Sequence, residues 1–162
     1  MDEDPPQIDA WAALLNAQSE VVRHIEAELK AQGQISLTWY DVLLSLEFAP
    51  GQRLRMSEIA ESIVLSRSAL TRSVDKLEAA GLLRRERCEE DERGAYAALT
   101  DKGREAMALA RPVCWAAIEK YFAAPLTKTE IATLTRILDK IILHARGLTA
   151  KQRVVKRRTT DA

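Results

Sequence analysis

The stretch from residue 65 to residue 83 constrains the fold most, because it predicts a short helix that is bounded at both ends by its own residues. Three apolar residues spaced i, i+4 and i+7 share one side of that helix: Leu70, Val74 and Leu77. The opposite side carries polar residues: Ser68, Arg72 and Asp75. Ser66 is suited to cap the start of the helix, and Gly81 is suited to the left-handed conformation that closes it. The stretch therefore predicts a helix with one buried stripe and one polar face.

A second short helix is predicted just before this one. Its apolar side is formed by Met56, Ile59, Ala60 and Ile63. Two short helices joined by a tight turn form a helix-turn-helix. After Gly81, residues 82–88 and 95–99 predict two short strands around a turn of acidic residues, arginine and glycine. The order of elements thus predicts a helix-turn-helix followed by a β-hairpin, or wing.

Two helices are predicted on the N-terminal side of this unit. Residues 8–32 carry apolar residues mostly at helical spacing, and that helix ends before Gly33. Ser36 or Thr38 can cap the next helix, which must end at the segment Ala49-Pro50-Gly51 because proline and glycine both interrupt helical hydrogen bonding.

Two further helices are predicted on the C-terminal side. Thr100 is expected to cap a helix that runs towards Phe122, with Pro112 inside it as a bend. Thr127 and Glu130 form a capping box that opens the last helix. The last helix has more apolar surface than a small winged domain can cover from one side: Ile131, Leu134, Ile137, Leu138, Ile141, Ile142 and Leu143. A partner helix is the simplest way to cover that surface.

Composition and charge narrow the class of protein. The 162 residues are 47% hydrophobic and 30% charged, which favours a folded chain over disorder. The formal net charge is zero, but residues 1–30 are acidic, whereas residues 66–87 and the tail from 149 are basic and favour phosphates. No apolar run is long enough to cross a bilayer and the acidic start is unlike a signal peptide, so a cytoplasmic location away from membranes is expected. Cys88 and Cys114 match no metal-binding or Cys-x-x-Cys spacing, and no disulfide is expected.

Four motifs in register resemble the MarR family of winged-helix transcriptional regulators, and the resemblance extends to about Gly147. They are Leu54-Arg-Met-Ser-Glu-Ile-Ala60, Leu65-Ser-Arg-Ser-Ala-Leu-Thr-Arg-Ser-Val-Asp-Lys-Leu-Glu-Ala-Ala-Gly81, Asp91-Glu-Arg-Gly94 and Leu99-Thr-Asp-Lys-Gly103. The resemblance implies a mainly α fold with a small β-wing. It also implies a homodimer with an N-terminal dimerisation helix (1–35), a winged helix-turn-helix DNA-binding domain (36–100) and C-terminal dimerisation helices (101–148). The basic residues 149–162 are expected to form a disordered tail.

By this resemblance, the polar face of the helix in residues 66–80 enters the major groove of operator DNA. The expected contacts come from one helix: Arg67, Ser68, Thr71, Arg72 and Lys76. The chemistry agrees, because arginine can donate two hydrogen bonds to guanine and hydroxyl groups can bind base edges or phosphates. Arg93 resembles the wing arginine that reaches the minor groove in this family, and Asp91 the acid that orients it. The resemblance implies a regulator, most often a repressor, that binds a pseudo-palindromic operator.

Family members commonly respond to small aromatic or phenolic molecules, and this implies an effector pocket near the dimerisation helices. Five residues are candidate ligand contacts: Trp11, Arg23, His24, Trp39 and Tyr40. Aromatic residues at helical spacing also serve as core packing, so that alternative stays open for each. Trp11 resembles the first-helix tryptophan of urate-responsive members, but the acid and arginines that would accompany it are not identified.

Other function classes are weighed against the same residues. The basic neighbours of Cys88 can lower its pKa, which leaves redox sensing open, although the first helix lacks the reactive cysteine of the redox-sensing relatives. Cys114 is expected to be a core residue. His24 and His144 have no neighbours at metal-ligand spacing. The chain has no glycine-rich nucleotide loop and no nucleophile triad, so neither an enzyme nor a cofactor is expected. The alternative left open is a winged-helix protein-interaction module without specific DNA binding.

Overall fold

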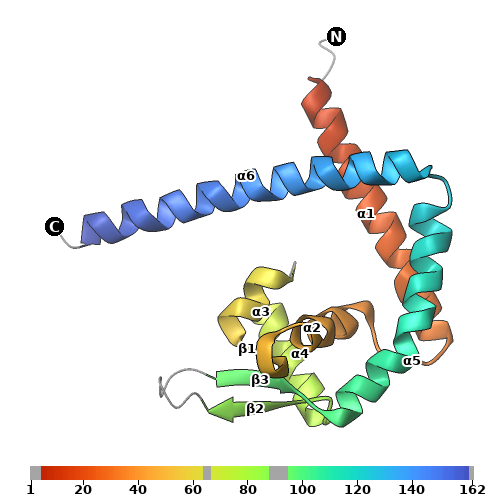
Figure 1. Ribbon diagram of the computed structural model, residues 1–162, viewed down its shortest axis with the longest axis vertical. Coiled ribbons are helices and arrows are strands. Elements are labelled where there is room, and N and C mark those ends of the chain that lie inside the picture. The colour runs from red at the N-terminus through yellow and green to blue at the C-terminus, as the bar shows by residue number, and fades with distance from the viewer. Residues whose placement is uncertain (1–4, 64–66, 88–94, 161–162) are drawn as a thin grey trace. The chain divides into compact units, whose positions relative to one another are not determined.

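The computed structural model describes residues 5–63, 67–87 and 95–160, which fold into helices and one small sheet (Figure 1). The elements, in chain order, are α1 (Pro6–Ala31), α2 (Leu37–Glu47), η1 (Pro50–Gln52), β1 (Arg53–Arg55), α3 (Met56–Ser62), α4 (Arg67–Ala79), β2 (Leu83–Arg87), β3 (Ala95–Leu99), α5 (Asp101–Ile118), the π-helical turn η2 (Glu119–Ala123) and α6 (Lys128–Thr160). The chain divides into two compact units, residues 1–121 and 122–162. The mainly α fold with a small β-wing is confirmed.

The helix ends are set by the capping residues that the sequence singled out. The Ser36 hydroxyl accepts a hydrogen bond from the Trp39 backbone N–H at 3.2 Å and so caps α2. At α6 the Thr127 N–H donates to the Glu130 carboxylate at 2.8 Å, while the Glu130 N–H donates to the Thr127 hydroxyl at 3.3 Å, which completes the capping box. Gly81 has φ +73° after α4, the left-handed region predicted for it. Ser66, the predicted cap of α4, lies outside the described residues.

The sheet has three antiparallel strands in the order β1-β3-β2. β2 and β3 pair from Leu83↔Leu99 to Arg87↔Ala95 and form the predicted hairpin. β1 was not expected, because alternation over only three residues, Arg-Leu-Arg, is too short to indicate a strand. It adds to the free edge of β3, and it joins α2 and α3 to the wing.

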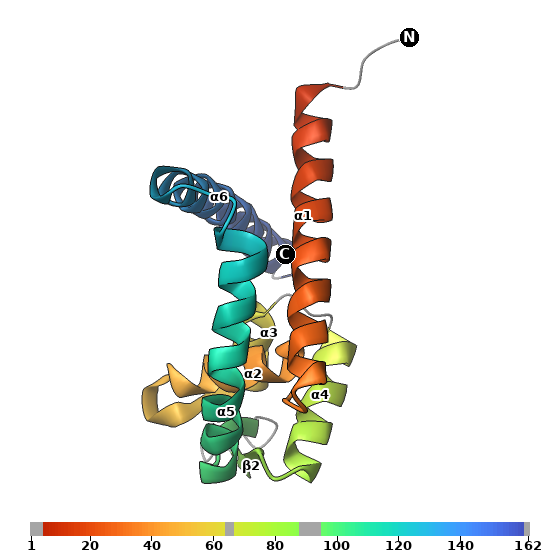
Figure 2. The same ribbon diagram turned by 90° about the vertical axis from the view of Figure 1, so that its right-hand side faces the viewer.

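The core of the first unit is formed where the helices meet the sheet. Its fully buried side chains come from α1, α2, α3, α4, the sheet and α5: Leu29, Val42, Leu43, Leu46, Ile59, Leu70, Val74, Leu77, Leu83 and Met107. Figure 2 shows α1 and α5 running alongside one another, and the two helices are in contact. This packing holds α2 between the long helices and the winged domain.

The C-terminal helix α6 extends further than the sequence indicated. Residues 149–160 are helical in the structure, whereas their basic composition predicted a disordered tail. The segment contains no proline or glycine, and alanine, lysine, glutamine and arginine all favour a helix, so nothing in it interrupts the backbone hydrogen bonds. Among the described residues, no helix is long and apolar enough to span a membrane.

Candidate functional site

The helix α4 separates its apolar and polar residues as its sequence predicted. Leu70, Val74 and Leu77 are buried in the core. The polar side chains on the rest of the helix are exposed: Ser68, Thr71, Arg72, Asp75 and Lys76. The sequence pattern therefore found both sides of this helix correctly.

A stripe of polar residues runs along the exposed side of α4. Ser68, Arg72 and Lys76 follow one another at four-residue intervals, which aligns them on one face. The Arg72 Nε donates to the Ser68 carbonyl oxygen at 3.3 Å, so the guanidinium lies back along the helix. Arg67 is the first residue of α4, where the helix dipole adds positive charge. The stripe and the helix start together form a surface suited to a polyanion.

The wing is fastened to α4 through Arg85 on β2. Its guanidinium donates to Asp75 at 2.5 Å and to Glu78 at 2.6 Å, and its backbone N–H donates to Glu78 at 3.1 Å. The hydrogen bond with Asp75 contributes most to raising the pKa of Arg85. This pairing sets one cation against two acids of α4 and offsets part of their negative charge, so the cations on the exposed stripe act with less opposing charge. Sequence reasoning did not single out Arg85, although it noted the basic run around it.

A group of hydrogen bonds, called here the Thr100 clasp, joins the end of α4 to the start of α5. The Thr100 hydroxyl donates to the Gly81 carbonyl at 2.8 Å and accepts from the Gly103 N–H at 3.0 Å. The Lys102 ammonium donates to the Ala80 carbonyl at 2.8 Å. A Cβ on Gly103 would lie 2.0 Å from the Leu82 carbonyl oxygen, so only glycine fits there. The motif Leu99-Thr-Asp-Lys-Gly103 is therefore the joint between α4 and the long helix.

The outer face of the sheet is also basic. Arg53 and Arg55 of β1 stack over the Tyr96 ring, with 4.9 Å and 5.4 Å from guanidinium carbon to ring centroid. Arg84 and Arg53 both pair with Glu86, at 2.7 Å and 3.4 Å. The hydrogen bond from Arg84 is the main reason why the pKa of Glu86 is below its ordinary value. The wing-tip candidates Asp91 and Arg93, and Cys88, lie outside the described residues.

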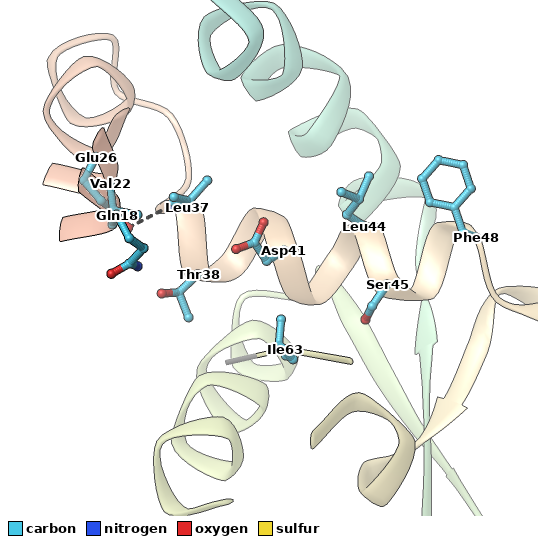
Figure 3. A pocket seen from close by; sticks show the side chains of 10 residues that line it. All are labelled: Gln18, Val22, Glu26, Leu37, Thr38, Asp41, Leu44, Ser45, Phe48 and Ile63. Atoms are coloured by element: carbon cyan, nitrogen blue, oxygen red, sulfur yellow. Dashed lines mark hydrogen bonds between the residues drawn. The ribbon is translucent and has the colours of Figure 1, made fainter. Parts of the chain in front are cut away.

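A pocket of about 540 Å³ opens between α1 and α2 (Figure 3). Its walls come from α1, from α2 and its C-terminal end, and from the residue after α3: Gln18, Val22, Glu26, Leu37, Thr38, Asp41, Leu44, Ser45, Phe48 and Ile63. Glu26 accepts a hydrogen bond from the Leu37 backbone N–H at 3.0 Å, which ties the two helices together. Burial, with a smaller contribution from Glu26, raises the pKa of Asp41 to about 6.

None of the five predicted ligand contacts lines this pocket. Tyr40 is buried in the core at 3% exposure and Trp39 packs against the core, because they lie on the sides of α2 that face away from the pocket. His24 stacks on Tyr121, with ring centroids 4.4 Å apart, and Arg23 pairs with Glu20 at 2.5 Å. Trp11 lies near the start of α1 and is 58% exposed. Arg23 and His24 contact each other, with Nη2 and Nε2 3.1 Å apart, but they do so outside the pocket.

Among the residues that the structure describes, neither the cysteine nor the possible metal ligands form a reactive site. Cys114 is buried, and burial raises the pKa of its thiol, which disfavours the reactive thiolate. In the described parts of the chain, no three His, Cys, Asp or Glu side chains are grouped as metal ligands.

Comparison with known proteins finds similar sequences and similar folds. The sequence model of the MarR family matches residues 34–94. The chain is 30% identical over 128 residues to the transcriptional repressor MprA of Escherichia coli K12, a match that covers 79% of this chain and 72% of the repressor. It is similar to AbsC, a MarR family transcriptional regulator from Streptomyces coelicolor, with a TM-score of 0.78, 32% identity and coverage of 91% and 98% of the two chains. A second regulator of that family from Streptomyces coelicolor, solved in complex with DNA, has a TM-score of 0.78 at 29% identity, over 88% of this chain and 89% of that one.

Proposed function

Because the chain belongs to the MarR family of winged-helix transcriptional regulators, which are not enzymes, we propose that it represses transcription as a homodimer on a pseudo-palindromic operator and is released by a small aromatic ligand. The observation that carries this proposal is the exposed polar and basic stripe of α4, held in position by the Arg85 pairing and by the Thr100 clasp.

In the proposed complex α4 lies in the major groove. Base edges and the flanking phosphates are contacted by four residues near the start of the helix: Arg67, Ser68, Thr71 and Arg72. Lys76 contacts the phosphate backbone. Arg93 at the wing tip reaches the minor groove, with Asp91 orienting it. The basic face of the sheet supports this arrangement, since it adds positive charge beside the hairpin.

Dimerisation is proposed through the long helices, residues 1–35 and 101–148. Large apolar side chains are exposed on α1, α5 and α6: Ile8, Trp11, Leu15, Leu109, Trp115, Ile137, Ile141, Ile142 and Leu143. Such surfaces need a cover in water, and a second copy of the same helices supplies one. Two copies of α4 would then reach half-sites about 34 Å apart, one turn of DNA.

Release by a ligand is supported by the pocket between α1 and α2. A molecule bound there would change how a dimerisation helix sits against the first helix of the winged domain. Repression is supported by the similarity to MprA, which is a transcriptional repressor.

Binding to DNA is tested by fluorescence anisotropy with a duplex from the region upstream of the protein's own gene, against a scrambled duplex at about 0.15 M salt. We expect a dissociation constant of roughly 10 nM and a preference of about a thousandfold. Arg72→Ala should weaken binding by about ten- to a hundredfold and relax the preference, because it removes a contact to the bases.

The matched control is Arg136→Ala, which removes an exposed arginine of α6 and should leave the affinity nearly unchanged. Equal losses in the two variants would assign the effect to net charge and contradict the base contact. Failure to prefer any duplex in a selection from random sequences would instead favour the protein-interaction module.

A further inference from the structure

The pocket between α1 and α2 has an unusual combination of walls. Part of its lining is apolar, with Val22 from α1, Leu44 from α2 and Ile63 from the residue after α3, and Phe48 at the end of α2 is 81% exposed. In Figure 3 Asp41 lies midway along α2, between Leu37 and Leu44. The pocket's volume of about 540 Å³ is within the range that holds a small organic molecule. An apolar group of a ligand could pack against these exposed apolar side chains.

The charge of the pocket has one sign. Asp41 and Glu26 are the charged residues among those lining it, and none of the lining residues is Lys, Arg or His. Glu26 is bonded to the Leu37 N–H, whereas no described cation pairs with Asp41. The other polar groups are Gln18, Thr38 and Ser45, and the Ser45 hydroxyl donates to the Val42 carbonyl at 2.7 Å, so its oxygen is left as an acceptor.

The environment of Asp41 shows that this carboxylate lacks a counter-charge. Its pKa is raised first by burial and then by Glu26. The same two acids add to the rise in the pKa of Cys114 on α5, after the effect of the thiol's own burial. A positive charge entering the pocket would relieve both effects, and a negative charge would increase them.

We infer that the pocket takes an arylalkylamine, an amine on an alkyl carbon beside an aromatic ring, whose ammonium group lies between the carboxylates of Asp41 and Glu26, with its ring against Leu44 and Phe48. An ammonium group only donates hydrogen bonds and an ionised carboxylate only accepts them, so the two are complementary. The inference rests on the proposed release by a small aromatic ligand, and it narrows that ligand to a cation. A phenolate or an aromatic carboxylate would face two like charges in a partly buried site.

The test uses three probes with one ring system and three charges: naphthylmethylamine, naphthalenemethanol and naphthoate. Their binding to the full chain without DNA is measured by isothermal titration calorimetry at about pH 7.5, where the amine is a cation and Asp41 is mostly ionised. We expect the amine to bind at least about tenfold more tightly than the alcohol, and naphthoate to bind more weakly than either.

Variants separate the carboxylates from the shape of the pocket. Asp41→Asn and Glu26→Gln should each weaken amine binding by about tenfold and leave the alcohol nearly unchanged. Both retain an oxygen that accepts hydrogen bonds, so the Leu37 contact is preserved, and circular dichroism checks that each variant is folded. Glu105→Gln removes an exposed carboxylate outside the pocket and should change no probe's affinity.

The outcomes distinguish this inference from the proposed function. Equal affinities for the three probes, or a preference for naphthoate, would overturn the inference, while operator binding measured separately would still stand. Tight amine binding that is lost in Asp41→Asn supports it. If the amine then fails to release the protein from its operator, the ligand class holds and the proposed release is wrong.

Discussion

Asp41 is a side chain that the folded protein holds in a position unfavourable to its charge. Its pKa rises from an ordinary 3.8 to about 6, so between these values the folded chain binds a proton that the unfolded chain releases. The free energy of unfolding must therefore fall as the pH rises through that window and stay lower above it. Because the group is partly solvated, we place the loss on the order of 1–2 kcal/mol.

Asp41→Asn should remove this loss. We expect the free energy of unfolding to rise by about 1 kcal/mol at about pH 7.5 and to change much less at about pH 4, where the native carboxyl is already protonated. Urea denaturation at both pH values measures the effect, with Glu105→Gln as the control. A variant that is destabilised at both pH values would mean that the Asp41 carboxyl group forms a stabilising hydrogen bond in the pocket.

Single residues also show where sequence reasoning stops. The two faces of α4 follow from spacing alone, since Leu70 and Val74 need only the helical period to share a side. Asp41 gives no such signal, because its raised pKa comes first from burial in the fold and then from Glu26, which lies on another helix. The aromatic candidates such as Tyr40 were chosen for their chemistry, yet the turn of α2 directs Tyr40 into the core.

At the scale of elements, the joint between α4 and α5 depends on a close approach of backbones. Gly103→Ala would bring a Cβ to within 2.0 Å of the Leu82 carbonyl, which is backbone and cannot rotate away. We expect a loss of about 2–3 kcal/mol in the free energy of unfolding, measured by urea denaturation. Gly147→Ala is the matched control: nothing lies within 4 Å of its added Cβ, and alanine favours a helix, so it should be neutral or slightly stabilising.

Elements were predicted well where local chemistry sets their ends. Thr100 and the Thr127 capping box begin their helices as expected, because a cap and the turn that it closes lie within four residues of each other. β1 could not be found in this way, since its three residues become a strand only through pairing with β3. Residues 149–160 were expected to be disordered because they are basic, but they are helical in the structure. Charge was given more weight there than helix propensity.

At the scale of the whole molecule, the exposed apolar residues of α6 need an explanation beyond the single chain. The surplus was evident from the sequence, because seven apolar positions in one helix exceed what one side of a small domain can cover. Four of them are exposed in the structure: Ile137, Ile141, Ile142 and Leu143. What covers them lies outside one chain's sequence pattern, so the dimer remains a proposal.

Ile141→Glu tests that proposal, because Ile141 is 52% exposed and a buried unpaired carboxylate opposes association. Sedimentation should show the monomer–dimer dissociation constant raised by about a hundredfold or more, which corresponds to roughly 3 kcal/mol. Operator affinity should fall with it, since one α4 reads only one half-site. Ala132→Glu adds the same charge on the opposite face of α6 and should leave the dimer intact. If Ile141→Glu stays dimeric while Trp115→Glu on α5 does not, association uses the apolar face of α5 instead. If both stay dimeric, neither of these two faces forms the interface.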